Sequence, residues 1–229
     1  MTPQPLSRTA LLAVTLGRLL AGVVVIGGML FIPAGTLGFW QAWAWLGVTF
    51  APVVAIGIVL LIKDPELLER RMRTRERETP QKKVIAAFIL ILVVMFVLPG
   101  LDRRFGWSAV PTGLVVLSDL LILLGLGLFV LTIRENRYAS RVIEVHDEQV
   151  VISSGPYSVV RHPMYLAMTL VLFFSPLALG SYWALLTALP IPFLLALRIR
   201  NEEDLLRQGL PGYAEYAREV RHRLVPFLW

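Results

Sequence analysis

Six long apolar runs constrain this chain more than any other feature of its sequence. They span residues 9–33, 40–62, 84–100, 112–133, 164–179 and 182–197. A helix needs about 20 residues to cross the hydrocarbon layer, and only helices or closed barrels satisfy all their backbone hydrogen bonds there. The chain is 56% apolar and only 17% charged, so it is more apolar and less charged than a typical soluble domain. The sequence therefore predicts an all-α integral membrane protein with about six transmembrane segments.

The last two runs are the shortest, and only the turn Leu179-Gly180-Ser181 separates them. We expect them to form a helical hairpin. The chain then divides into two parts, 1–133 with the amino-terminal transmembrane helices and 134–229 with a loop, the hairpin and a polar tail.

Basic residues are distributed unequally among the linkers. The linker 63–83 carries eight of them, 134–161 carries four arginines, and the tail from Arg198 carries six more. The linkers 33–41 and 101–111 together carry only two. By the positive-inside rule, both termini and the two basic linkers are predicted to be cytoplasmic. The net charge of +6 is then a topology signal, with membrane lipids rather than nucleic acid as the expected partner.

Residues 66–78 have two readings within the first basic linker. They fit an amphipathic helix on the inner leaflet, with Leu67, Leu68 and Met72 facing lipid. They fit a solvated connector of mixed charge equally well.

Polar side chains are dense at 134–165 and again after Arg198. His162 precedes a proline and should be extended, while Pro163 suits the first position of the following helix. The hairpin should bring Glu202 and Glu203 back near Arg161. This arrangement predicts either a pocket with carboxylates and a guanidinium or a simple Arg161–Glu202 bridge. The chain has no cysteine, so cysteine zinc sites and a thiol nucleophile are excluded, and we expect no metal.

Three strings in this region resemble a known family. They are GPYSVVRHPMYLAM at 155–168, RIRNEEDLL at 198–206 and GYAEYAREVRHRLVPFL at 212–228. Together they are similar to the isoprenylcysteine carboxyl methyltransferases, whose wider group includes phospholipid methyltransferases. The resemblance runs from about residue 142 to the end. It implies a multi-pass enzyme that uses S-adenosyl-L-methionine, with 134–229 as the methyltransferase-like core.

The resemblance also implies roles for individual residues. Arg161 corresponds to the candidate for positioning the acceptor and for catalysis, and Glu202 is a second catalytic candidate. The implied cofactor-binding residues are Gln149, Val151, Ser153, Gly155, Tyr157, His162, Tyr165, Glu202 and Glu203. Gln149 stands where many members have histidine, and Leu210-Pro211-Gly212 replaces the usual F-G before the tail tyrosines Tyr213 and Tyr216.

Methyl transfer from a sulfonium requires little of a protein beyond correct placement of the two reactants. We therefore expect methyl transfer to a lipophilic acceptor that enters from the bilayer, such as the carboxylate of an isoprenylcysteine-like amphiphile. A phospholipid amine is an alternative acceptor. A membrane reductase of the sterol-reductase type, with Arg134, Arg137 and Arg141 holding the phosphate of NADPH, is an alternative enzyme, and a non-catalytic lipid-binding protein is a third possibility. The absence of cysteine and of an organelle-retention signal, with the compact size, favours a prokaryotic plasma membrane.

Overall fold

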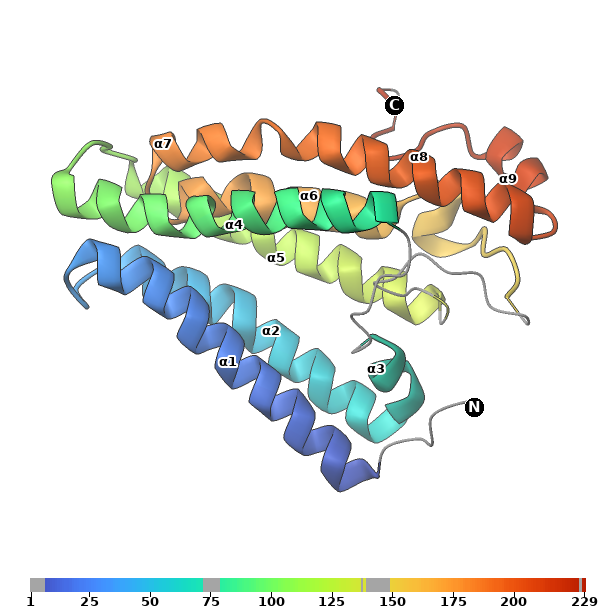
Figure 1. Cartoon of the computed structure of the whole chain (residues 1–229), viewed down its shortest axis with the longest axis horizontal. Coiled ribbons are helices and arrows are strands. Elements are labelled where there is room, and N and C mark those ends of the chain that lie inside the picture. Colours follow the sequence, from blue (N-terminus) through green and yellow to red (C-terminus); the bar gives the residue numbers. More distant parts are fainter. Residues whose placement is uncertain (1–6, 72–78, 137, 139–148, 227) are drawn as a thin grey trace.

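The computed structural model describes residues 7–71, 79–136, 138, 149–226 and 228–229. All regular elements in this part of the chain are helices, which confirms the predicted all-α fold (Figure 1). In chain order they are α1 (Arg8–Ala34), α2 (Trp40–Lys63), α3 (Pro65–Arg71), α4 (Thr79–Phe105), α5 (Thr112–Glu135), the 3-10 turn η1 (Gly155–Ser158), α6 (Pro163–Ala178), α7 (Tyr182–Leu185), the 3-10 turn η2 (Leu186–Ala188), α8 (Ile191–Gly209) and α9 (Tyr213–Glu219).

Five helical stretches are long and apolar enough to cross a membrane. They are Arg8–Ala34, Trp40–Lys63, Ile85–Phe105, Thr112–Glu135 and the stretch Tyr182–Gly209, which joins α7, η2 and α8. The sixth apolar helix, α6, has only 16 residues and so a length of about 24 Å. The hairpin predicted for the last two runs is formed by α6 and the α7–α8 stretch. Its turn uses Gly180, whose φ of 73° favours glycine.

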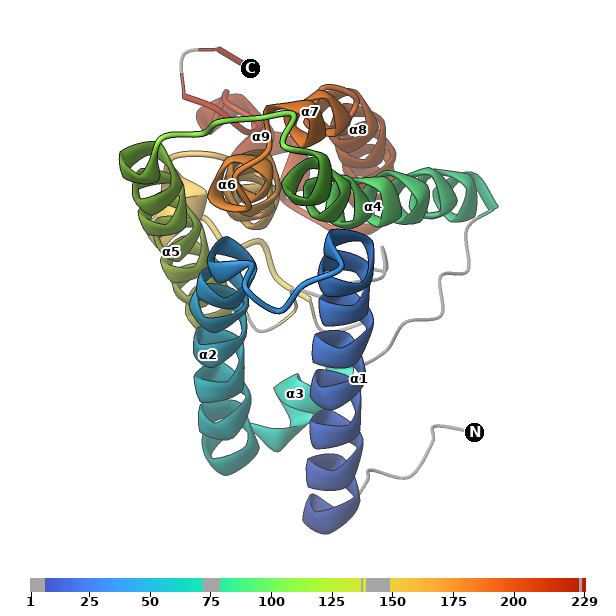
Figure 2. The ribbon, with the colours of Figure 1, turned by 90° about the vertical axis from the view of Figure 1, so that its left-hand side faces the viewer.

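Helix α6 lies innermost among the helices and contacts α2, α4, α5, α7 and α8. Its closest approach is to α5, where a Cβ on Gly125 would lie 3.0 Å from the Ala167 carbonyl oxygen. Figure 2 shows α6 between α5 and the α7–α8 stretch. This packing fixes the position of the first turn of α6, where the sequence predicts the site.

The pair α1 and α2 meets the other helices at one end and then diverges from them (Figures 1 and 2). A Cβ on Gly100 of α4 would lie 2.4 Å from the Leu30 carbonyl oxygen, so α1 and α4 touch there through their backbones. Much of the remaining surface of the pair is apolar and exposed, as at Leu20 and Val24. Such a surface suits contact with lipid.

The short helix α3 corrects one expectation. Leu67 and Leu68 are buried in the protein, because α3 packs against α1 and α2. They therefore do not face lipid as an amphipathic surface helix requires. Residues 72–78, including Met72, lie outside the described part of the chain.

A buried carboxylate, that of Asp102, lies at the end of the bundle where a loop connects α4 to α5. Asp102 accepts hydrogen bonds from the backbone and the hydroxyl of Ser108, both at 2.7 Å, and from the hydroxyl of Ser181. Ser181 also caps α7 by accepting from the Ala184 N–H. The carboxylate thus joins the α4–α5 loop to the turn of the hairpin.

Candidate functional site

The site is built around the joint between η1 and α6. Pro163 occupies the first turn of α6, as predicted. His162 precedes it outside the helical region, but with φ of −125° and ψ of 60° it is not extended as expected. The N–H groups of Arg161 and His162 donate to the carbonyls of His222 and Arg223, both at 2.9 Å. The backbone of the joint is therefore paired directly with the tail.

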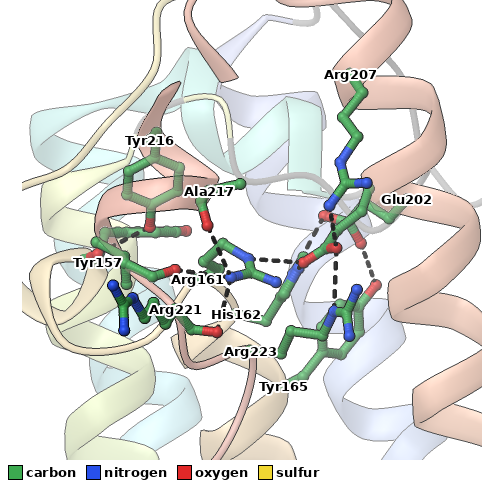
Figure 3. Close-up of polar contacts among 12 residues, drawn as sticks. Tyr157, Arg161, His162, Tyr165, Glu202, Arg207, Tyr216, Ala217, Arg221 and Arg223 are labelled. Carbon is green, nitrogen blue, oxygen red and sulfur yellow. Dashed lines mark hydrogen bonds and ion pairs between the residues drawn. The ribbon is translucent and has the colours of Figure 1, made fainter. Parts of the chain in front are cut away.

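The side chain of Arg161 strengthens the same connection (Figure 3). Its Nε donates to Glu203 Oε1 at 2.8 Å. Its Nη1 faces three carbonyl oxygens near the end of α9, those of Ala217 at 3.4 Å, Val220 at 2.7 Å and Arg221 at 2.9 Å. These are carbonyls that a helix end leaves without partners. The bridge expected between Arg161 and Glu202 is thus made to Glu203 instead, and Nη1 of the guanidinium holds the tail.

Glu203 is the centre of the charged network and is 1% exposed. One oxygen, Oε1, meets Arg161 and lies 3.3 Å from His162 Nε2. The other, Oε2, accepts from Arg223 at 3.1 Å and from Arg207 at 3.4 Å. A buried carboxylate needs such compensation for its lost hydration.

Glu202 lies on the other side of the imidazole. Its Oε1 is 3.9 Å from His162 Nδ1, and its Oε2 accepts from the Tyr165 hydroxyl at 2.7 Å. Arg198 Nε in turn donates to that hydroxyl at 2.8 Å. A continuous polar chain therefore runs from Arg198 at the membrane side to the arginines of the tail.

A cavity of about 90 Å³ opens beside this chain. Its lining combines apolar, aromatic and charged side chains from the segment after α5, the loop before η1, the joint between η1 and α6, and helices α6, α8 and α9. The lining residues are Asn136, Tyr138, Gln149, Val150, Val151, Ile152, Tyr157, Arg161, His162, Met164, Tyr165, Arg198, Glu202, Leu206, Leu210, Tyr213 and Tyr216.

Seven of the residues singled out from the sequence line this cavity. They are Gln149, Val151, Tyr157, Arg161, His162, Tyr165 and Glu202. Three others, Ser153, Gly155 and Glu203, do not. Ser153 is exposed, and Gly155 turns the chain with φ of 56° where a Cβ would lie 3.1 Å from the Glu135 side chain. Gly155 therefore shapes the loop rather than the cavity wall.

Two groups of lining residues were not among the predicted site residues. Arg198 and Leu206 lie four residues on either side of Glu202, and this helical spacing puts all three on one face of α8. That spacing was a usable signal. Asn136 and Tyr138 follow α5, and nothing in the local sequence associates them with a site.

The two tyrosines of α9 complete the wall. Tyr216 donates to the Tyr157 carbonyl at 2.8 Å, and Asn136 donates to the Tyr157 hydroxyl at 3.0 Å. Burial raises the pKa of the phenols of Tyr213 and Tyr216 well above the ordinary value, so both are neutral at physiological pH. Each can act as a hydrogen-bond donor.

Comparison with known proteins places this geometry in a family context. Residues 114–211 match the family model of phospholipid methyltransferases. This region begins with α5, ends before α9, and includes Arg161, His162, Glu202 and Glu203. The match confirms the resemblance predicted from the sequence, and that family group is one of membrane methyltransferases.

One curated relative is also similar. The chain is 35% identical over 140 residues to the cobalt-zinc-cadmium resistance protein CzcN of Cupriavidus metallidurans. The alignment covers 56% of this chain and spans 58% of the length of that relative.

Proposed function

We propose that this protein is a membrane methyltransferase that transfers a methyl group from S-adenosyl-L-methionine to a lipophilic acceptor at the membrane–cytoplasm interface. The observation that carries the proposal is the cavity between α6, α8 and the tail. It combines an aromatic and apolar wall with a glutamate and two arginines, and it is formed largely by the region that matches the methyltransferase family.

The lining fits the chemical groups of this cofactor. An adenine ring needs an apolar or aromatic slot with few hydrogen bonds, which Val151, Tyr157 and Leu210 can provide. The aminoacyl end carries an ammonium, which suits the carboxylate of Glu202. When bound, the cofactor supplies an electrophilic methyl group on its sulfonium.

The role of the protein is then mainly to position the acceptor. A carboxylate acceptor is already anionic and needs no general base, only a cation that orients it. We assign this positioning to Arg161, whose Nη2 makes no hydrogen bond to any residue that the structure describes. An isoprenylcysteine-like carboxylate or another anionic amphiphile fits this arrangement.

An amine acceptor is the second candidate, because the matching family model is that of phospholipid methyltransferases. An amine must lose a proton, and Glu202 beside His162 is placed to accept it. The same match gives no support to a sterol-reductase-type enzyme. Of the arginines considered for that reading, Arg137 and Arg141 lie outside the described residues.

The proposed location follows from the same geometry. The helix α9 and the end of α8, which contribute to the lining of the cavity, lie at the same end of the bundle as the start of α1 and the end of α2 (Figure 1). The basic linkers follow α2 and α5 in the sequence. We place this end in the cytoplasm of a prokaryotic cell, with both termini on that side.

Calorimetry of the detergent-purified protein tests the proposal. We expect saturable binding of S-adenosylhomocysteine and none of NADPH. Binding of NADPH alone would overturn it. Mass spectrometry of lipids from cells that lack or overproduce the protein then identifies the acceptor as a species one methylene heavier in the overproducing cells.

A further inference from the structure

The two tyrosines of α9 share one environment but differ in how their hydroxyls are used. Tyr213 is 4% exposed and Tyr216 is 5% exposed, and their ring centroids are 5.9 Å apart. Both line the cavity. Tyr216 donates to the Tyr157 carbonyl, whereas the Tyr213 hydroxyl is shielded from solvent and has no hydrogen-bond partner among the described residues.

A buried hydroxyl without a partner is costly. Leaving such a group unsatisfied destabilises a protein by about 1–3 kcal/mol, and the great majority of buried polar side-chain atoms are paired. Phenylalanine in place of Tyr213 would avoid this cost while filling the same space. The hydroxyl therefore calls for a partner that the described part of the chain does not supply.

The surroundings of Tyr213 indicate the chemistry of that partner. The carboxylates of Glu203 and Glu202 and the guanidinium of Arg161 are the charged groups that act on its phenol. The ring of Tyr213 packs in one cluster with Leu210, Val151 and Tyr157, so Tyr213 lies between the slot assigned to adenine and these charged groups. Burial keeps its phenol protonated, so the hydroxyl offers a proton and suits an acceptor atom.

We propose that the Tyr213 hydroxyl is a binding group for the carboxylate of the aminoacyl end of the cofactor. This inference rests on the proposed function, because it assigns one residue to one end of the molecule proposed to bind there. Tyr213 then holds the carboxylate, Glu202 holds the ammonium, and Arg161 remains available to the acceptor.

Two ligands and two matched variants test this assignment. S-adenosylhomocysteine carries the aminoacyl end, and methylthioadenosine has the same adenosine and sulfur without it. In Tyr213→Phe we expect the affinity for S-adenosylhomocysteine to fall by about tenfold or more, the scale of a hydrogen bond to a charged group, with the affinity for methylthioadenosine unchanged. The melting temperature should not fall, because the hydroxyl that is removed has no partner in the unliganded protein.

The control is Tyr216→Phe, which removes the hydroxyl bonded to the Tyr157 carbonyl. It should lower the melting temperature and should change the affinities for the two ligands by the same factor. Equal affinities of wild type and Tyr213→Phe for S-adenosylhomocysteine would overturn the assignment, as would an equal loss for both ligands. Failure of the wild type to bind either ligand would instead contradict the proposed function itself.

Discussion

Asp102 and Glu203 are buried carboxylates at opposite ends of the same bundle, 2% and 1% exposed, and they are compensated differently. Asp102 meets neutral donors from two serines in neighbouring loops. Glu203 meets the side chains of three arginines and a histidine from the α6 joint, α8 and the tail. The carboxylate of Asp102 therefore joins two loops through hydrogen bonds, whereas that of Glu203 is a counter-ion for several cationic side chains.

The difference matters for what each end can bind. A cavity also lies beside Asp102, but the carboxylate there is satisfied by three donors from the chain. At the Glu203 end, arginines outnumber the glutamates, and an unpartnered hydroxyl lines the wall. Surplus positive charge and an unused donor favour an anionic group on the ligand. This comparison therefore points to the Glu203 end as the functional one.

Replacing Glu203 should have the largest effect. In Glu203→Gln the buried Arg161, the partly buried Arg223 and the exposed Arg207 lose their counter-ion, and removing one partner of a buried pair costs about 3–5 kcal/mol of stability. We expect a clear fall in melting temperature in detergent and faster proteolysis of the tail. Wild-type melting and wild-type tail protection would show that the cations do not depend on this carboxylate.

Arg161 should come next. Arg161→Ala removes one of the donors to Glu203 and the side-chain donor to the carbonyls at the end of α9, so we expect a stability loss of about 2–4 kcal/mol. Arg161→Lys should recover only part of it, because an ammonium cannot span the carboxylate and the carbonyls together. The sequence alone also allows both variants to melt near the wild-type temperature. That result would mean that Arg161 acts only in positioning the acceptor.

Glu202→Gln separates the two adjacent glutamates. Glu202 lines the cavity and its side chain is 24% exposed, so its loss should spare stability. We expect affinity for S-adenosylhomocysteine to fall by about 1.5–3 kcal/mol through loss of a charge-assisted hydrogen bond. His162→Ala should weaken binding in the same calorimetric assay. Unchanged affinity in both variants would mean that the cofactor does not bind at this position.

Asp102→Asn tests the other end of the comparison. An amide retains one acceptor for the serines, so we expect a smaller stability loss of about 1–2 kcal/mol, and unchanged binding of S-adenosylhomocysteine. Combined with Glu203→Gln, the stability losses should add within about 0.5 kcal/mol, because the two sites share no partner. A double variant that departs strongly from additivity would show that the two ends are coupled.

Single cysteine substitutions should disturb the protein least. They report on which side of the membrane each end of the bundle lies. Thr36 and Gln208 are exposed at the two ends of the bundle, and the chain has no native cysteine. An impermeant thiol reagent added to intact cells should label Thr36→Cys and not Gln208→Cys. The reverse pattern would invert the proposed topology.

The helical architecture was predictable because bilayer physics permits few solutions for apolar runs of this length. The start of α6 was equally predictable, since Pro163 constrains both its own backbone and that of His162. One of the two readings of residues 66–78 placed Leu67 and Leu68 against lipid. That reading was wrong, because an amphipathic pattern does not distinguish lipid from a neighbouring helix.

The partner of Arg161 was misassigned for a related reason. On α8, Leu195, Ile199 and Glu203 are spaced by four residues and are all buried, while Arg198, Glu202 and Leu206 share the face that lines the cavity. Helical periodicity therefore contained the information that Glu203 faces inward and Glu202 faces the cavity. The unpartnered hydroxyl of Tyr213 and the carbonyls around Arg161 depend on how the tail docks, which no local pattern specifies.

The attachment of Arg161 to the tail also bears on how the protein is made. The carbonyls that receive its Nη1 lie 56 to 60 residues further along the chain, beyond the whole hairpin. During translation, Arg161 is therefore made and its helix inserted well before those partners leave the ribosome. Contacts of such sequence separation form late, because the intervening chain must be ordered first. The cavity that Arg161 lines is thus among the last parts of the molecule to form, because it requires a tail that has been synthesised and docked.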